Sequence, residues 1–68
     1  MMELTVNGKK QQFENVSNII DLLNALEIQR DQVAVMVNGD VIRRADHPTT
    51  QLHDGDAVEI ITIVGGGA

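Results

Sequence analysis

The sequence predicts an α+β fold in which a mixed sheet of about four to five strands packs on one helix. Two Asn-Gly pairs, at 7–8 and 38–39, each lie between extended segments and are typical of tight hairpin turns. One segment, 19–26, carries apolar residues at the spacing of a helix face, and a final apolar run, 58–64, stops at three glycines. A chain of 68 residues is expected to form one domain.

The first hairpin is predicted near the start of the chain. Residues 3–6 alternate polar and apolar side chains, the period of a half-buried strand. Asn7 and Gly8 both tolerate the positive φ angles of a two-residue type I′ turn. We expect the return strand to run from Lys9 to about Glu14, with Phe13, the lone aromatic residue, as its core anchor.

A single helix is predicted next, after a cluster of turn-forming residues. Asn18 and Asp21 resemble a capping box with aspartate in place of glutamate, and Ser17 is a competing N-cap. The helix should span roughly ten residues, ending near Glu27, with Ile28 folding back as an apolar plug. Its core face consists of Ile19, Leu22, Leu23 and Leu26.

The second hairpin follows a polar connection at 29–32. The β-branched run 33–37 is long enough for a strand and short for a helix. Residues 38–40 form its turn, and 41–43 return as a short strand.

An irregular loop and a final strand complete the predicted fold. Residues 44–51 include the lone proline and read as a loop, and 53–56 form a tight turn. The last strand, 57–64, is expected to pair beside the first strand of the chain, after a right-handed crossover through the helix. The predicted core residues are Leu4, Val6, Phe13, Leu22 or Leu23, Leu26, Val35, Val37, Leu52, Val58 and Ile60.

Composition excludes several functional classes. A net charge of −5 opposes binding to nucleic acid or an anionic membrane, and the longest apolar run is too short to span a bilayer. The chain has no cysteine, so it has no disulfide and no side-chain thiol that could carry sulfur. A domain this small has little room for an enclosed active site, so we expect no catalytic residues and no bound cofactor. We also expect a cytoplasmic, monomeric protein.

Strand alternation predicts an apolar patch on the sheet face away from the helix. If Val58 and Ile60 face the helix, then Glu59, Ile61 and Ile63 face the other way, and the same parity places Ala34 and Met36 with them. Apolar side chains with no second helix above them favour a docking surface for a protein partner. The predicted interface is Met36, Ile61, Ile63 and Val64.

The chain end suggests its own chemistry. We expect a folded domain at 1–64 and a flexible tail at 65–68, because Gly65, Gly66 and Gly67 have no side chains to pack. Such a tail is either a frayed end or a reactive terminus slender enough to enter a narrow enzyme channel.

Two other groups of residues have structural explanations. His47, His53, Asp54 and Asp56 could be metal ligands, but the chemistry of a tight turn accounts for the aspartates, and we predict no metal site. The Arg43-Arg44 pair could bind an anion but is more typical of a solvated strand end.

The chain resembles the ubiquitin-like β-grasp proteins and, among them, the small ThiS-type sulfur carriers of thiamine biosynthesis. The matching features are the turn at 7–8, the helix at 19–26, the segments 37–39 and 52–60, and the glycine run that follows Val64. The resemblance covers essentially the whole chain.

The resemblance implies a mechanism. A ThiF-type adenylyltransferase uses ATP to convert the terminal glycine carboxylate, here Gly67 or less favourably Gly66, to an acyl adenylate. Sulfur from cysteine, supplied indirectly by a cysteine desulfurase, then replaces AMP to give a thiocarboxylate, which passes its sulfur to thiazole synthase. The apolar patch predicted by strand alternation adds the hypothesis that Met36, Ile61 and Ile63 contact this adenylyltransferase.

The sequence departs from the family in its last residue. Family members commonly end on glycine, whereas Ala68 follows Gly67 here, so we expect Ala68 to be removed before use or to be foreign to the working protein. Three alternatives stay open: the sulfur-carrying small subunit of molybdopterin synthase, a ubiquitin-like protein modifier, and a β-grasp binding module with an inert tail.

Overall fold

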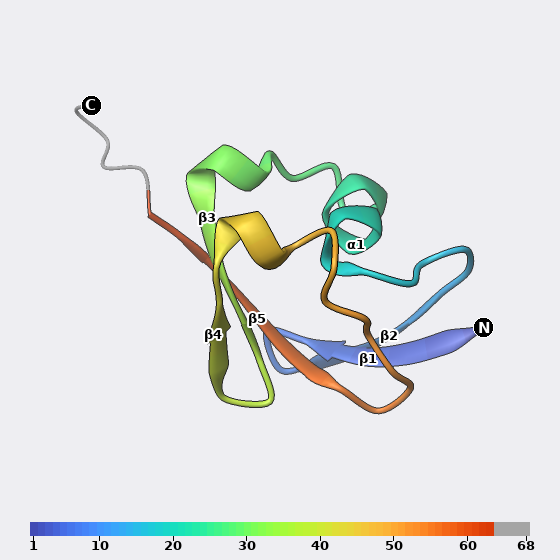
Figure 1. Cartoon of the computed structure of the whole chain (residues 1–68). Helices are drawn as coiled ribbons and strands as arrows, with labels where there is room; N and C mark the ends of the chain where they lie inside the picture. The colour runs from blue at the N-terminus through green and yellow to red at the C-terminus, as the bar shows by residue number, and fades with distance from the viewer. Residues whose placement is uncertain (64–68) are drawn as a thin grey trace.

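The computed structural model describes residues 1–63 and contains a five-stranded sheet with one α-helix (Figure 1). The predicted order of hairpin, helix, hairpin, loop and final strand is confirmed. The strands are β1 Met2–Val6, β2 Lys9–Phe13, β3 Val33–Val37, β4 Asp40–Ile42 and β5 Ala57–Thr62. The helices are α1 Ile19–Ala25 and the 3₁₀ turns η1 Arg30–Gln32 and η2 Arg44–Asp46. No helix within the described part of the chain is long and apolar enough to cross a membrane.

The sheet is mixed, and β5 is its central strand. The strand order is β2-β1-β5-β3-β4, with β5 parallel to β1 and antiparallel to β3. The predicted pairing of the last strand beside the first is therefore confirmed. In Figure 1, α1, η1 and η2 all lie on the same side of this sheet. The opposite face has no helix over it within residues 1–63.

The helix is shorter than predicted because its C-terminal end is tightly capped. Asn18 is the N-cap and accepts a 2.8 Å bond from the Asp21 amide, whereas the Asp21 carboxylate bonds to the amide and hydroxyl of Ser17. At the other end, Glu27 adopts a positive φ of 58°. The Ile28 amide donates to the Leu23 carbonyl, and the Glu27 amide to that of Asn24. This is the Schellman pattern, which ends α1 near residue 25 where the apolar spacing alone predicted 27.

The strand ends and the loops also differ in detail from the sequence prediction. β2 ends at Phe13 where Glu14 was predicted, and the polar connection at 29–32 contains η1. The loop predicted to be irregular at 44–51 begins with η2. Short 3₁₀ turns of polar residues have no apolar period, so the pattern that identifies longer elements does not detect them.

The core lies between the helix and the inner face of the sheet. Its fully buried predicted members are Leu4, Val6, Leu22, Leu23, Val35, Val37, Leu52 and Val58, and Ile19 from the helix face joins them. Phe13, Leu26 and Ile60 pack on this cluster but are only partly buried. The sequence prediction missed Val16, Val33 and His47, which are buried as well.

Candidate interaction face and chain end

The central strand carries the chain toward its end. After Thr62, the Ile63 amide donates a 2.9 Å hydrogen bond to the Gln32 carbonyl at the end of η1. The last described residue is therefore tied to the body of the fold. Val64 and the predicted tail residues Gly65, Gly66 and Gly67 lie outside the described residues, so their assigned roles stay predictions.

An asparagine from each hairpin turn holds one side of β5. The side-chain oxygen of Asn7 accepts from the Ile60 amide at 2.8 Å, and the Asn7 amide donates to the Val58 carbonyl at 2.9 Å. The side-chain oxygen of Asn38 accepts from the Ala57 amide at 2.9 Å, and its own amide donates back to the Ala57 carbonyl at 2.7 Å. Both side chains thus extend the ladders beyond the last backbone pairs. The Asn-Gly pairs predicted the two turns from the sequence. No sequence pattern predicts that the asparagine side chains also bond to β5.

The turn before β5 uses its carboxylates to bind backbone. Asp54 accepts from the Glu3 amide at 2.7 Å, and the Gly55 amide donates to the Glu3 carbonyl at 2.7 Å. Asp56 accepts from the His53 amide at 2.8 Å and from the Asn38 side-chain amide at 3.0 Å. These bonds give both aspartates a structural role. No group of three His, Asp or Glu side chains within residues 1–63 is placed to hold a metal ion.

The sheet face away from α1 carries an apolar patch, as strand parity predicts. Register places Ala34 opposite Ile61, and Met36 between Val41 on β4 and the exposed Glu59 on β5, so these side chains share one face. Ile61 is 46% exposed, Ile63 60% and Val41 69%, whereas Met36 is half-buried between its neighbours. We call Ala34, Met36, Val41, Ile61 and Ile63 the outer-face patch. Val41 was not predicted, although its place opposite Met36 across the second hairpin was available from the turn.

His47 lies in the core, so it is not a solvent-exposed candidate metal ligand. The residue is 1% exposed, and neither ring nitrogen has a hydrogen-bond partner among residues 1–63. Burial lowers the pKa of His47 below its usual value, and the charges of Arg30 and Arg44 act in the same direction, whereas the nearby Ile42 backbone and the Asp46 charge oppose the shift. The two histidines named as candidate ligands are thus in opposite environments, because the side chain of His53 is 77% exposed.

A mixed five-stranded sheet packed on one helix, with β5 parallel to β1 at its centre, defines a small ubiquitin-like β-grasp protein. The model of the ThiS family matches residues 1–67. The chain therefore belongs to the ThiS family, whose members are the sulfur carriers of thiamine biosynthesis.

Solved structures and curated relatives agree with this membership. The crystal structure of the thiamine biosynthesis protein (ThiS) from Geobacter metallireducens is 43% identical, with a TM-score of 0.83 over 97% of this chain and 100% of that one. Its solution structure by NMR is 41% identical, with a TM-score of 0.78 over 98% of this chain and 90% of that one.

Two curated relatives differ greatly in length. A thiazole synthase of Paramagnetospirillum magneticum is 30% identical over 67 residues, which are 98% of this chain but only 21% of that protein. The uncharacterized protein ycf40 of Porphyra purpurea is 32% identical over 66 residues, covering 97% of this chain and 93% of that protein.

Proposed function

We propose that this chain carries sulfur at its last glycine, Gly67, for thiazole formation in thiamine biosynthesis, after hydrolysis of the Gly67–Ala68 peptide bond has released Ala68 and freed the Gly67 carboxylate. The family match over residues 1–67 is the observation that carries the proposal. A carboxylate is a poor acyl donor because its leaving group is an oxide, so it must first be activated. In the proposed first step the carboxylate attacks the α-phosphate of ATP, forming an acyl adenylate and releasing pyrophosphate. A sulfur donor then displaces AMP and leaves a thiocarboxylate.

The chain in this proposal is a co-substrate, and its partner enzymes supply the catalytic groups. The ATP belongs to a ThiF-type adenylyltransferase, and the sulfur comes from cysteine through a desulfurase. The absence of cysteine from all 68 residues supports the terminus as the sulfur-carrying atom, since no side chain offers a thiol. We expect the chain to act as a monomer in the cytoplasm, where thiols stay reduced.

The outer-face patch is the proposed docking surface for the adenylyltransferase. It is apolar, it lies on the side of the sheet away from α1, and it reaches Ile63, where the described chain ends. A partner bound there would contact the residues from which the chain end leaves the fold. The same chain end must enter the active site of that partner. The patch would bury Met36, Ile61 and Ile63 together, with Val64 continuing the contact.

The proposed sulfur acceptor is a thiazole synthase. The support is the Paramagnetospirillum thiazole synthase, of which 21% is similar to nearly all of this chain. In that protein a sequence of this kind and the remainder of a thiazole synthase belong to one polypeptide, which favours a functional association between the two.

Intact-mass measurement tests the proposal. The chain is incubated with its adenylyltransferase, a cysteine desulfurase, cysteine and ATP, in forms that end at Gly66, Gly67 and Ala68. We expect the Gly67 form to gain the mass difference between one sulfur and one oxygen, and the Ala68 form to react slowly. The Cβ of Ala68, on the carbon next to the reacting carboxyl group, would displace the carboxylate, and a shift of about 1 Å can cost about 10²-fold in rate. If none of the three forms gains sulfur, the carrier function is wrong; if branched lysine conjugates form instead, the chain is a protein modifier.

A further inference from the structure

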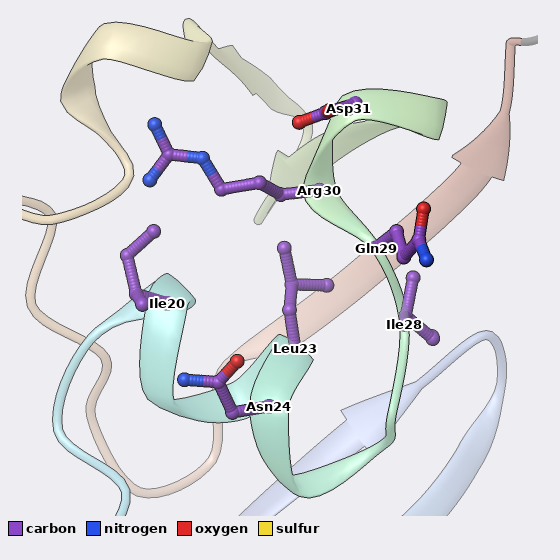
Figure 2. A pocket seen from close by; sticks show the side chains of 7 residues that line it. All are labelled: Ile20, Leu23, Asn24, Ile28, Gln29, Arg30 and Asp31. Atoms are coloured by element: carbon purple, nitrogen blue, oxygen red, sulfur yellow. The ribbon is translucent and has the colours of Figure 1, made fainter.

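A pocket of about 290 Å³ opens between α1 and η1, on the helix side of the fold and away from the outer-face patch (Figure 2). Its lining residues are Ile20, Leu23, Asn24, Ile28, Gln29, Arg30 and Asp31. The volume lies at the lower end of the range for small-molecule sites. It corresponds to about ten non-hydrogen atoms if each takes the ~30 Å³ that a water molecule occupies in the liquid.

The floor and walls of the pocket are aliphatic and built into the fold. Leu23 is 1% exposed and forms the floor, with half-buried Ile20 and Ile28 beside it. Figure 2 shows Leu23 rising from α1 toward the side chain of Arg30, which crosses from η1 above Ile20. The bond from the Ile28 amide to the Leu23 carbonyl fixes the helix end, so the two apolar walls are held in place without a ligand.

Arg30 supplies an uncompensated positive charge at the rim. Its side chain is half-buried and makes no hydrogen bond or ion pair with any residue of the described chain. The neighbouring acid, Asp31, is already paired with Arg44 at 2.6 Å, so its charge is balanced from outside the pocket. An unpaired cation at the rim of an apolar pocket favours a ligand that has both an apolar body and an anionic group.

We propose that this pocket binds a small organic acid, with its carboxylate on Arg30 and its apolar body on Leu23, Ile20 and Ile28. The Asn24 and Gln29 side chains lie at other points of the edge, away from the Arg30 guanidinium (Figure 2). The site is separate from the proposed sulfur chemistry, although η1 also holds Ile63 through the Gln32 carbonyl. A ligand of this size in an open pocket should bind with a dissociation constant of roughly 0.1 to 1 mM.

Amide NMR titration of the whole chain with hexanoate at constant ionic strength tests this site. Acetate carries the charge without the apolar body, and hexanol carries the apolar body without the charge. We expect hexanoate alone to give saturable shifts, at the amides of residues 23–24 and 28–31. Arg30→Gln should weaken hexanoate binding about tenfold, the value of one charge-assisted hydrogen bond. Arg43→Gln removes the same charge from an exposed position outside the pocket and should change binding less than about twofold.

Three results would overturn the site. The first is the absence of saturable shifts with hexanoate. The second is a set of shifts located away from α1 and η1. The third is equal weakening by Arg30→Gln and Arg43→Gln, which would mean that overall charge and not the pocket attracts the acid. The unliganded amide spectrum of each variant establishes that its fold is intact, and none of these measurements depends on transfer of sulfur.

Discussion

The side-chain oxygen of Asn7 accepts a 2.8 Å hydrogen bond from the Ile60 amide, joining residues 53 positions apart in the chain. The parallel pairing of β1 with β5 extends only from Thr5 to Val6 in the first strand. Asn7 adds two further bonds to β5, one from its backbone amide to the Val58 carbonyl and one from the Ile60 amide to its side chain. A turn residue therefore fastens the strand that leads to the chain end.

Asn7→Ala should lower the free energy of unfolding by about 1 to 3 kcal/mol, because alanine loses this hydrogen bond and disfavours the positive φ of 49°. Asn15→Ala is the matched control, since Asn15 has φ of 61° but makes no side-chain hydrogen bond within residues 1–63. Urea denaturation should show that Asn15→Ala lowers the free energy of unfolding by about 0.5 to 1.5 kcal/mol less than Asn7→Ala does. Equal losses would mean that the Asn7–Ile60 bond adds nothing.

Alanine substitutions on the core face of α1 should cost more stability at a buried position than at a partly exposed one. Leu22 is 0% exposed, so Leu22→Ala should cost about 2 to 5 kcal/mol. That approaches the whole stability of roughly 3 to 10 kcal/mol expected for a domain of this length. Leu26, the C-cap residue, is only partly buried, and Leu26→Ala should cost clearly less. A larger midpoint shift for Leu26→Ala in thermal unfolding would contradict this ordering.

Glu27→Gly should stabilise the protein by about 0.5 to 1 kcal/mol. Glu27 occupies the left-handed position of the Schellman motif with φ of 58°, where glycine has no steric cost. Ala25→Gly, two residues earlier in α1, places glycine in ordinary helical backbone and should cost about 1 kcal/mol. Denaturation midpoints of both variants check the pair, and a loss of stability in Glu27→Gly would be inconsistent with the capping geometry.

Stability should fall on acidification because of His47. Its pKa in the fold is lowered below its ordinary value of 6.5, so below that pH the unfolded chain binds a proton that the folded chain resists. The contribution of His47 to the free energy of unfolding is complete above the ordinary pKa of histidine. This contribution is lost as the pH falls through and below that pKa. The charges near His47 are Arg30, Arg44 and Asp46, and the two arginines oppose its protonation.

Denaturation of His47→Gln and His53→Gln between about pH 7.5 and 5 measures this effect. His47→Gln should be less stable at neutral pH but should lose part of the pH dependence. His53→Gln, which replaces the exposed histidine, is the matched control. Identical slopes in all three proteins would exclude His47 as the source.

Met36→Asp combined with Ile61→Asp should weaken binding to the adenylyltransferase by about tenfold or more, because a charge would be buried in an apolar contact. The control is a double change on the polar half of the same sheet face, Thr5→Asp with Gln12→Asp, which adds the same charge. Isothermal titration with the enzyme compares the two. Undiminished affinity in the patch variant, with its amide spectrum intact, would place the docking surface elsewhere.

Periodic elements could be predicted from the sequence, whereas features that depend on single contacts could not. Alternation and two Asn-Gly turns identified the strands, and parity identified the outward face of Ile61. By contrast, His47 stands in a loop without any apolar period, so nothing local signals that it fills the core. The end of α1 depends on Glu27 adopting a left-handed conformation that the sequence alone would assign to glycine or asparagine. The pocket likewise depends on how η1 lies over Leu23, which is a matter of tertiary packing.

The central position of β5 has a mechanical consequence. A partner that draws on the chain end pulls β5 along its own axis through Ile63, while β1 and β3 are bonded to its two sides. Force in that direction loads the ladder bonds together in shear, whereas force on an edge strand such as β4 would open them one at a time. The fold thus resists being opened by a pull applied at Ile63.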